Sequence, residues 1–297
     1  MKFLKLIELI RPKQWIKNMF VFAAILFAGE LLHFENLIKS LVAFFAFCGV
    51  SSAVYIINDI TDVESDRVHK EKRFRPLASG AISVKSAQIF FVIIAVITIL
   101  LSLRLNTGFQ IIVASYFLIN LIYSLKVKDV VLLDVFFISA GFLGRVVAGA
   151  LAINVPLSSW MLLTTIFISL FLAISKRRAE LSQVEAGNIE KQRKVLSQYD
   201  IVFTDQINTI AATGTIICYA LYTVSEKSIK TFQTDALIYT TPFVIFGIFR
   251  YMYLLHKKNL GESPSSIVTK DIPIIITTVL WGLISIFIIY KSKGFTW

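Results

Sequence analysis

Long apolar runs separated by short charged segments dominate this chain. Nine windows have about 20 mostly apolar residues, the length that a helix needs to cross a bilayer. Their approximate bounds are 16–34, 37–57, 84–104, 108–124, 129–153, 157–175, 204–225, 235–256 and 271–290. The period-two alternation typical of a lipid-facing barrel is not seen in them. The pattern therefore predicts an all-α, polytopic membrane protein with nine transmembrane helices.

Composition supports this prediction and excludes a soluble globular chain. Hydrophobic residues make up 56% of the sequence and charged residues 16%, and the mean hydropathy is +0.74. The net charge of +11 comes from cations at the edges of the apolar windows. Cations so placed set topology and meet anionic lipid head groups, so membrane lipids are the expected partners and nucleic acid is not. Cys48 and Cys218 lie inside apolar windows and are expected to be packing residues.

The distribution of lysine and arginine predicts the orientation. With nine spans, 23 of the 30 basic residues fall on the side of the N-terminus. The positive-inside rule places that side in the cytoplasm and the C-terminus outside. The two longest polar stretches, 58–85 and 176–203, are then both cytoplasmic, and each is predicted to cap a cavity. Residues 1–297 are expected to form a single membrane-embedded domain, with a first helix that is retained and not cleaved as a signal peptide.

The segment NDITDVESDRVHKEKRFRP at 58–76 carries the densest chemistry. If the preceding helix continues, Asn58, Asp62 and Asp66 recur at four-residue spacing on one face, and Asp59 lies one position round. Carboxylates so placed repel each other and need a cation. An oxygen-only set of ligands suits Mg²⁺ bound jointly with a substrate phosphate. The alternative is a solvated loop that pairs its own acids and bases.

Basic residues follow these carboxylates directly. Lys72 and Arg75, with Arg73 nearby, are suited to holding phosphate oxygens through charge-assisted hydrogen bonds. Pro76 is predicted to end the helix and Gly80 to permit the return into the next span. His69 has two interpretations: a group that orients a phosphate or transfers a proton, or an idle loop histidine.

Two further segments at the same membrane edge are candidates for substrate binding. Tyr123 and Lys126 lie at a short turn, where they are either diphosphate contacts or an ordinary interfacial aromatic and lysine. The loop after the sixth span opens with three adjacent cations and an acid, which suit a second phosphate site and a sugar hydroxyl. These residues are Lys176, Arg177, Arg178 and Glu180. The alternative is a plain positive-inside flank.

Arg145 lies well inside the fifth predicted span. An arginine at a helix centre costs about 2.5–3.5 kcal/mol on insertion scales, so such residues usually face the bundle interior or a wet cavity. Two roles stay open: lining a substrate cavity, or structural pairing with Glu30 or Asp134. Glycines flank this position and allow close helix packing or a bend; they are Gly141, Gly144 and Gly149.

Several chemistries are absent from the sequence. It contains no GxxxxGK[ST], no HExxH and no CxxC pair, and its three histidines lie far apart. Nucleotide hydrolysis by a P-loop and zinc catalysis are therefore excluded.

The chain resembles the UbiA superfamily of intramembrane prenyltransferases. The resemblance covers most of the chain and rests on the nine-span pattern, on NDITDVESD and on four further segments. These segments are RPKQWIKN at 11–18, YSLKVK at 123–128, GFLGRVVAG at 141–149 and SKRRAEL at 175–181. The ending HKEKRFRP at 69–76, together with KRRAEL, favours the phosphoribosyltransferase branch of that superfamily.

This resemblance implies a fold, a location and a reaction. The fold is a helical bundle around a central cavity in a bacterial plasma membrane, with the active site facing the cytoplasm. The reaction is the Mg²⁺-dependent attack of a polyprenyl phosphate on C1 of 5-phosphoribosyl 1-diphosphate, with diphosphate as the leaving group. The nucleophile is already an anion, so no strong general base is required.

The resemblance also implies roles for individual residues. The ligands of Mg²⁺ would be Asn58, Asp59, Asp62 and Asp66. The residues closest to the chemistry would be Asp62, Asp66, Lys72 and Arg75. Tyr123 and Lys126 would hold the sugar phosphates, and Lys17 with Lys13 would hold the lipid phosphate. The remaining candidates for substrate contact come from the residue patterns described above and are Arg145, Lys176, Arg177 and Glu180.

The chain departs from the superfamily pattern in two places. Aromatic prenyltransferases of the superfamily carry a second aspartate-rich motif after the sixth span, where this chain has Lys176, Arg177 and Arg178 and keeps Glu180. A phosphate held by cations is therefore favoured over a diphosphate held by two metal clusters. Lys70 stands where the phosphoribosyltransferase branch usually has proline.

Two rival functions remain at this point. One is an aromatic prenyltransferase that uses a prenyl diphosphate donor. The other is a transporter or flippase, which the lack of a convincing internal repeat disfavours. The sequence leaves the oligomeric state open, with a homo-oligomer among the options.

Overall fold

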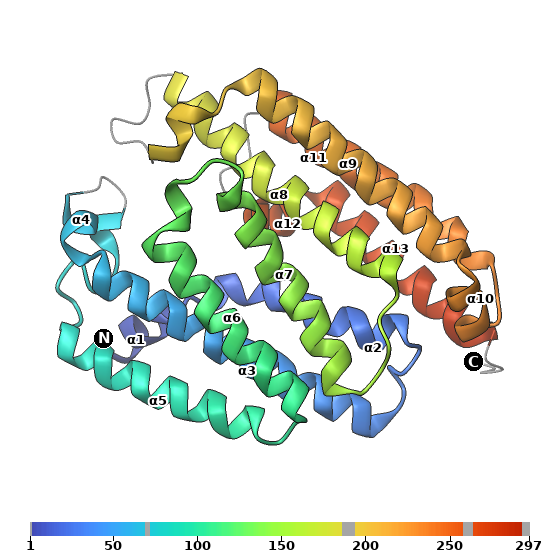
Figure 1. The fold of residues 1–297 in the computed structure, drawn as a ribbon, viewed down its shortest axis with the longest axis horizontal. Helices are drawn as coiled ribbons and strands as arrows, with labels where there is room; N and C mark the ends of the chain where they lie inside the picture. The colour runs from blue at the N-terminus through green and yellow to red at the C-terminus, as the bar shows by residue number, and fades with distance from the viewer. Residues whose placement is uncertain (1, 69–71, 186–193, 258–263, 293–297) are drawn as a thin grey trace. The chain divides into compact units, whose positions relative to one another are not determined.

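The computed structural model describes residues 2–68, 72–185, 194–257 and 264–292, and the secondary structure in these ranges is helical, with no strand (Figure 1). The α-helices (α) and 3-10 helices (η) run as follows: α1 Lys2–Leu9, η1 Pro12–Phe22, α2 Ala23–Phe27, α3 Phe34–Thr61, α4 Val63–Arg67, η2 Lys72–Phe74, α5 Val84–Ser102, α6 Thr107–Leu125, η3 Val127–Asp129, α7 Leu133–Ala152, α8 Ser159–Glu185, η4 Lys194–Gln198, α9 Ile201–Val224, α10 Glu226–Phe232, η5 Ala236–Thr240, α11 Thr241–Lys257, α12 Pro264–Lys270 and α13 Ile272–Ser292. The prediction of an all-α membrane protein is confirmed.

Eight candidate membrane spans are found among the described residues. They are α3, α5, α6, α7, α8 as far as Val184, α9, η5 joined to α11, and α13. Each coincides within a few residues with one of the predicted windows, except that α8 runs to Glu185, about ten residues beyond its window. The first window, 16–34, is not among them, because the chain there forms η1 and the short α2. The ninth span and the cytoplasmic N-terminus stay predictions.

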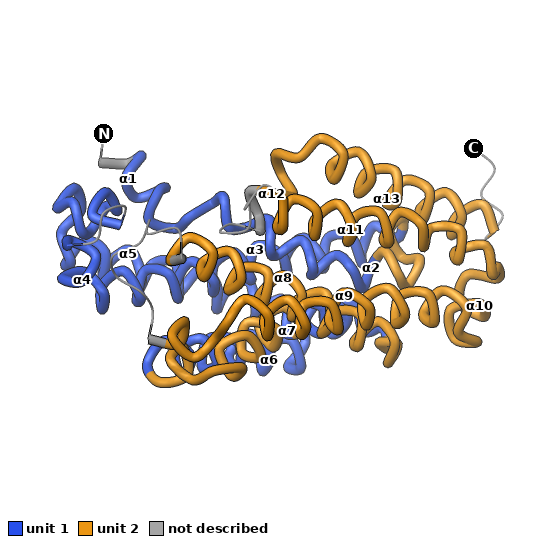
Figure 2. Tube along the Cα trace, turned by 90° about the horizontal axis from the view of Figure 1, so that it is seen from above, with its two compact units in different colours: residues 1–25, 33–125, 144–155 blue, residues 26–32, 126–143, 156–297 orange. Residues whose placement is uncertain are grey.

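The chain divides into two compact units (Figure 2). Unit 1 consists of residues 1–25, 33–125 and 144–155, and unit 2 of residues 26–32, 126–143 and 156–297. The expectation of a single membrane-embedded domain stays a prediction.

Unit 1 is built on α3, against which η1, α5 and α6 pack. The α3–α5 contact is close because Gly49 faces Thr98, and a Cβ on this glycine would lie 2.1 Å from the Thr98 Oγ1. Helix α5 begins where the Ser83 side chain accepts a hydrogen bond from the Ser86 amide at 3.1 Å, which satisfies one free donor of its first turn. Ile56 near the end of α3 and Ala87 near the start of α5 share one buried cluster, so the C-terminal end of α3 lies beside the start of α5.

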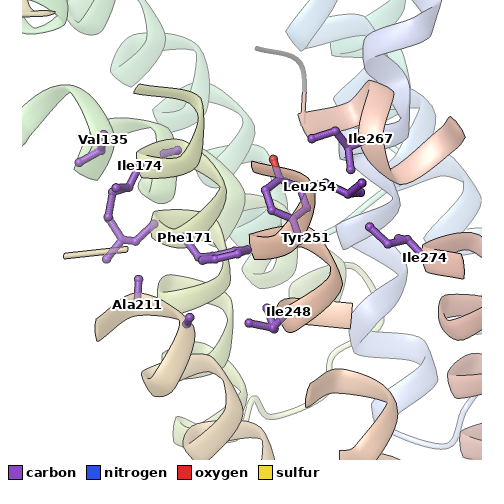
Figure 3. Packing of buried hydrophobic residues seen from close by; sticks show 12 residues of the cluster. Val135, Phe171, Ile174, Ala211, Ile248, Tyr251, Leu254, Ile267 and Ile274 are labelled. Atoms are coloured by element: carbon purple, nitrogen blue, oxygen red, sulfur yellow. The ribbon is translucent and has the colours of Figure 1, made fainter. Parts of the chain in front are cut away.

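Unit 2 is built on the pair α8 and α9 and on the pair α11 and α13. Gly214 of α9 meets Phe167 of α8, where an added Cβ would lie 2.5 Å from the ring. A buried apolar cluster joins α8, α9, α11 and α13, with Phe171 and Tyr251 packed edge to face at 5.2 Å between ring centroids (Figure 3). The Asp200 side chain caps α9 by accepting from the Phe203 amide at 2.7 Å. This core holds the basic end of α8 in place.

Candidate active site

The predicted spacing of the carboxylates is present at the end of α3. The Asp62 amide donates to the Asn58 carbonyl at 2.9 Å, and the Asp66 amide donates to the Asp62 carbonyl at 2.8 Å. Helical hydrogen bonding therefore continues from α3 through Asp62 into α4. It places Asn58, Asp62 and Asp66 on one side, as the four-residue spacing predicts.

Two of the carboxylates are buried and neutralised by arginine. Asp59 and Asp66 are each 3% exposed. An Nη1 of Arg75 donates to the Asp59 Oδ1 at 3.1 Å and to the Asp66 Oδ2 at 2.6 Å. Arg11 pairs with the same Asp59 oxygen, and the Lys72 Nζ lies 4.0 Å from the Asp66 Oδ1. We call Arg11, Asp59, Asp66 and Arg75 the aspartate–arginine cluster. Because Asp59 and Asp66 are buried, this cluster differs from the alternative of a solvated loop that pairs its own acids and bases.

Local backbone geometry brings Arg11 to this cluster. Arg11 has a φ of 52°, which turns the chain between α1 and η1, and Pro12 then starts η1. The Trp15 Nε1 donates to the Ser52 Oγ at 3.1 Å and fixes η1 along α3. The Arg11 guanidinium also lies over the Tyr55 ring, 4.7 Å from its centroid. Tyr55 is one helical turn before Asp59, so α3 supplies both contacts.

Arg75 is set in place by the turn that follows η2. The Ser79 amide donates to the Arg75 carbonyl at 2.9 Å, and the Ile82 amide donates to the Pro76 carbonyl at 3.0 Å. Gly80 has a φ of 75°, a left-handed conformation that glycine adopts without strain. The predicted role of Gly80 in the return to the next span is confirmed. His69 and Lys70 lie outside the described residues.

The donor chemistry fits a hard metal ion bound jointly with a phosphate. Within the described ranges, no group of three or more histidine, cysteine, aspartate or glutamate side chains is placed to hold a metal ion. Asn58 and Asp62 are half-buried, whereas Asp59 and Asp66 are engaged by cations. Mg²⁺ commonly takes one or two carboxylates and completes its shell with water and substrate phosphate. Asn58 and Asp62 are the groups that would hold such an ion, whereas Asp59 and Asp66, which were also predicted as ligands, are paired with Arg75.

Unit 1 also contains a buried arginine, Arg145, near the half-buried Lys17 of η1. Arg145 is 5% exposed; its Nε donates to the Asn18 Oδ1 at 2.8 Å and an Nη2 donates to the Tyr116 hydroxyl at 2.8 Å. Asn18 and Tyr116 are neutral, so they accept hydrogen bonds from Arg145 but do not offset its positive charge. Burial, followed by repulsion from Arg145 and Arg11, lowers the pKa of Lys17 to about 8. Lys13 is exposed. An anion near Lys17 would relieve this repulsion.

Tyr123 and Lys126 lie on either side of the division between the two units. Tyr123, in the last turn of α6, is half-buried, seven residues after Tyr116 and therefore on the same helix side. Lys126 is exposed and precedes η3. Their predicted contact with a sugar phosphate stays a prediction.

In unit 2 the basic segment of α8 is already engaged in ion pairs. Arg177 is 1% exposed; its Nε donates to Asp134 at 2.6 Å and an Nη1 donates to Glu180 at 2.6 Å. The Lys176 Nζ lies 3.8 Å from Glu180. Asp134, which the sequence offered as a partner for Arg145, is bonded to Arg177 and to the Tyr199 hydroxyl. Arg177 therefore suits a structural role as the partner of Asp134 and Glu180, and its predicted contact with substrate stays a prediction.

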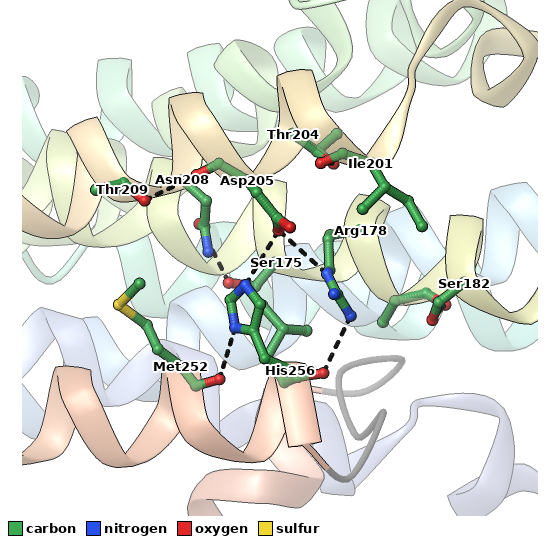
Figure 4. A network of polar contacts seen from close by, with 12 residues as sticks. Ser175, Arg178, Ser182, Ile201, Thr204, Asp205, Asn208, Thr209, Met252 and His256 are labelled. Atoms are coloured by element: carbon green, nitrogen blue, oxygen red, sulfur yellow. Dashed lines mark hydrogen bonds and ion pairs between the residues drawn. The ribbon is translucent and has the colours of Figure 1, made fainter.

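Arg178 belongs to a separate network that ties three helices together. Its Nε donates to the Asp205 Oδ1 at 3.1 Å and an Nη1 donates to the Leu255 carbonyl at 3.2 Å (Figure 4). His256 approaches the same Asp205 oxygen through its Nε2 at 3.2 Å. These contacts join α8, α9 and α11.

Sequence reasoning missed several residues that build these sites. Arg11 was assigned no role of its own beyond its place in RPKQWIKN at 11–18. Asn18 and Tyr116 carried no signal beyond polarity inside an apolar stretch. The acid Asp134 in an apolar window did carry one, because a charge placed there needs a partner. Nothing in the sequence around Tyr199 indicated its contact with Asp134.

A cavity of about 340 Å³ lies within unit 1, between α3, α5 and α6. Val50, Ala53 and Val113 are among its apolar lining residues. The hydroxyls of Thr98 and Ser102 in its wall donate to carbonyls of their own helix. This cavity offers hydrocarbon contact and no reacting group.

Comparison with known proteins identifies the family. Residues 18–270 match the UbiA prenyltransferase family. The chain is 37% identical to the decaprenyl-phosphate phosphoribosyltransferase of Mycolicibacterium smegmatis, over 93% of this chain and 89% of that protein. It is 33% identical to the protein of the same name from Corynebacterium glutamicum, over 98% and 88%. A solved UbiA homologue from Archaeoglobus fulgidus, bound to GPP and Mg²⁺, superimposes with a TM-score of 0.71 at 18% identity, covering 96% of this chain and 99% of that one. This last likeness concerns the fold alone.

Proposed function

Because the chain belongs to the UbiA prenyltransferase family and is a membrane-embedded transferase, we propose that it transfers 5-phosphoribosyl from 5-phosphoribosyl 1-diphosphate to a polyprenyl phosphate. A phosphate oxygen of the lipid attacks C1 of the ribose. The bond from C1 to the diphosphate oxygen breaks, and diphosphate leaves with the electron pair. The supporting relatives are both named for a transfer to decaprenyl phosphate.

One observation carries this choice over prenyl transfer to an aromatic ring. Three acids near the basic end of α8, namely Glu180, Asp134 and Asp205, are bonded to arginines. A second metal-bound diphosphate would need those carboxylates free of their cations. A cationic segment suits a phosphate ligand held by lysine and arginine.

The aspartate–arginine cluster supports the proposal by supplying fixed charge at the end of α3. Departure of diphosphate requires neutralisation of the charge that grows on its oxygens. Asn58 and Asp62 would hold Mg²⁺, which supplies that neutralisation when bound. Arg75 keeps Asp59 and Asp66 neutralised, and Lys72 stands beside Asp66. We assign Lys72 to the phosphates of the donor.

Lys17 is assigned to the phosphate of the lipid acceptor. Its side chain is half-buried near Arg145, and Tyr116 and Asn18 hold that arginine in a fixed position. Lys13, which is exposed, would contribute by attraction at longer range. No residue needs to remove a proton, because the attacking phosphate is already ionised. Tyr123, Lys126 and Glu180 stay proposed contacts of the sugar and its phosphates.

The test is an assay of the purified protein in lipid nanodiscs. Labelled 5-phosphoribosyl 1-diphosphate and a polyprenyl phosphate are supplied with Mg²⁺, and the lipid fraction is extracted. We expect label in the lipid that disappears when EDTA replaces Mg²⁺. An unlabelled lipid, together with transfer from a prenyl diphosphate to an aromatic acceptor, would replace this proposal with its rival.

A further inference from the structure

We propose that Tyr199, Asp134 and Arg177 form a buried positioning network that sets the backbone of the 126–132 turn and the carboxylate of Glu180. One part of this inference rests on the proposed function, namely that the 126–132 turn and Glu180 contact the anionic donor. The network itself lies wholly within unit 2.

Direct hydrogen bonds connect the three side chains. The Tyr199 hydroxyl donates to one oxygen of Asp134 at 2.8 Å, and the Arg177 Nε donates to the other at 2.6 Å. Asp134 is fully buried and Arg177 is 1% exposed. Burial and the bond to Asp134 both raise the pKa of Tyr199, so the phenol remains a donor over the physiological range. Both oxygens of Asp134 are thereby fixed in direction.

One end of the network holds a strained backbone position. Leu132 has a φ of 67°, in the left-handed region that residues with a Cβ rarely adopt. Its amide donates to the Tyr199 hydroxyl at 2.8 Å, and its carbonyl accepts from the Phe136 amide at 3.0 Å in the first turn of α7. A position of this kind persists when its surroundings hold it. Tyr199 therefore determines how the chain turns from η3 into α7.

Apolar packing places the same turn against η4. Val131 packs on the buried cluster of Val195, Leu196 and Tyr199, to which Leu181 of α8 also belongs. The cluster brings together the turn that begins at Lys126, the segment that follows α8, and the last part of α8 itself. The Tyr199 hydroxyl adds direction to this contact, since apolar packing alone leaves the turn free to adjust.

The other end of the network holds Glu180, whose side chain is 16% exposed. Arg177 donates to Glu180 at 2.6 Å, and Glu180 lies 3.8 Å from the Lys176 ammonium. Arg177 shares its charge between Asp134 and Glu180, and the Lys176 ammonium supplies the second positive charge beside Glu180. Lys126 and Lys176 are more exposed than these three residues. The network would hold the backbone that carries both lysines in a fixed position. Arg177 acts in this scheme through Glu180 and not by touching a phosphate.

The deciding variant is Tyr199→Phe, which keeps the ring in its apolar cluster and deletes the hydroxyl. Two hydrogen bonds are lost, so we expect KM for 5-phosphoribosyl 1-diphosphate to rise about tenfold while kcat changes by less than about twofold. We also expect faster amide hydrogen exchange across residues 126–132. The matched control is Tyr219→Phe, another buried tyrosine of unit 2 whose hydroxyl bonds to Thr240 at 2.6 Å. It should leave both KM and the exchange of the turn unchanged.

Asp134→Asn provides an independent variant. The amide keeps the size of the side chain and one acceptor for Tyr199, but it removes the charge that faces Arg177. We expect a rise in KM together with a lower unfolding temperature. Tyr199→Phe alone decides the matter if this second variant does not fold.

Hydrogen exchange makes the test independent of the identity of the substrate. Unchanged exchange at 126–132 in Tyr199→Phe would overturn the positioning network whatever the protein transfers. A loss confined to kcat, or an equal rise in KM with Tyr219→Phe, would also overturn it. A wild-type protein that fails to transfer phosphoribosyl would sink the proposed function and leave the exchange result standing.

Discussion

Arg11 and Asp59 are 48 residues apart in the sequence and form an ion pair at the end of α3. Asp59 is 3% exposed and also accepts from Arg75, so a single buried carboxylate is shared by two guanidinium groups. The N-terminal segment therefore contributes Arg11 to the aspartate–arginine cluster. Arg11 and Arg75 both stabilise the ionised form of Asp59, and Asp59 in turn offsets the charge of both arginines.

The first prediction concerns Arg11→Gln. Removing one partner from a buried ion pair typically lowers stability by about 3–5 kcal/mol, because it leaves a buried charge less compensated. Arg75 still pairs with Asp59, so we expect the lower end of that range and reduced turnover. Thermal unfolding in detergent and the transfer assay measure the two effects.

Arg67→Gln is the matched control. Arg67 pairs with Glu64 at 2.8 Å, but both side chains are more than half exposed, and such pairs contribute about 0–1 kcal/mol. Asp59→Asn in the Arg11→Gln background should restore stability without restoring activity. Equal unfolding temperatures for Arg11→Gln and Arg67→Gln would contradict the importance of the buried pair.

A second prediction separates the metal ligands from their neighbours. Asp62→Ala should abolish Mg²⁺-dependent turnover while the protein remains folded, since Asp62 is half-buried and α3 already ends at Thr61. Glu64→Ala, two residues away and itself exposed, should retain activity within about twofold, because exposed ion pairs contribute little. Full activity of Asp62→Ala would refute its assignment to the metal site.

The sequence predicted eight of the spans because their signal is local. A run of about 20 apolar residues identifies a spanning helix without knowledge of its neighbours. The four-residue spacing of Asn58, Asp62 and Asp66 is local too, and the hydrogen bonds through Asp62 confirm it. The window at 16–34 differs because Pro12 and a left-handed Arg11 start a 3-10 segment instead of a long helix.

Partners distant in sequence could not be predicted in this way. Arg177 looks like a free cation beside two others, yet the fold buries it against Asp134, 43 residues earlier. Arg145 was offered two acidic partners, whereas the structure gives it Asn18 and Tyr116. Such pairings depend on how helices pack, and no spacing along one helix reports them. The roles assigned to these residues in substrate binding remain predictions.

The third prediction concerns pH and Lys17. Its pKa is lowered to about 8, so the ammonium is largely present below that pH and is lost as the pH rises through it. If this ammonium attracts the lipid phosphate, kcat/KM for the polyprenyl phosphate should fall above about pH 8. Bound phosphate stabilises the charged form, so kcat at saturating lipid should fall at a higher pH.

Lys17→Arg tests this prediction directly, because arginine stays charged throughout that range. The fall in kcat/KM above pH 8 should disappear in this variant. Lys13→Arg is the control, since Lys13 is exposed, and its profile should match that of the wild type. Retention of the wild-type profile by Lys17→Arg would assign the titration to another group.

The fourth prediction uses two glycines of one helix. A Cβ on Gly149 would lie 2.0 Å from the Val21 carbonyl oxygen, whereas a Cβ on Gly144 would meet no atom within 4 Å. Gly149→Ala must therefore push α7 away from η1 at a typical cost of about 1–3 kcal/mol, and Arg145, one turn earlier, should lose its hold on Asn18. Gly144→Ala removes the entropic cost of a helical glycine and should stabilise the protein by up to about 1 kcal/mol. Thermal unfolding in detergent should place the two variants on opposite sides of the wild type. If both stabilise the protein, the close approach of α7 to η1 at Val21 is disproved.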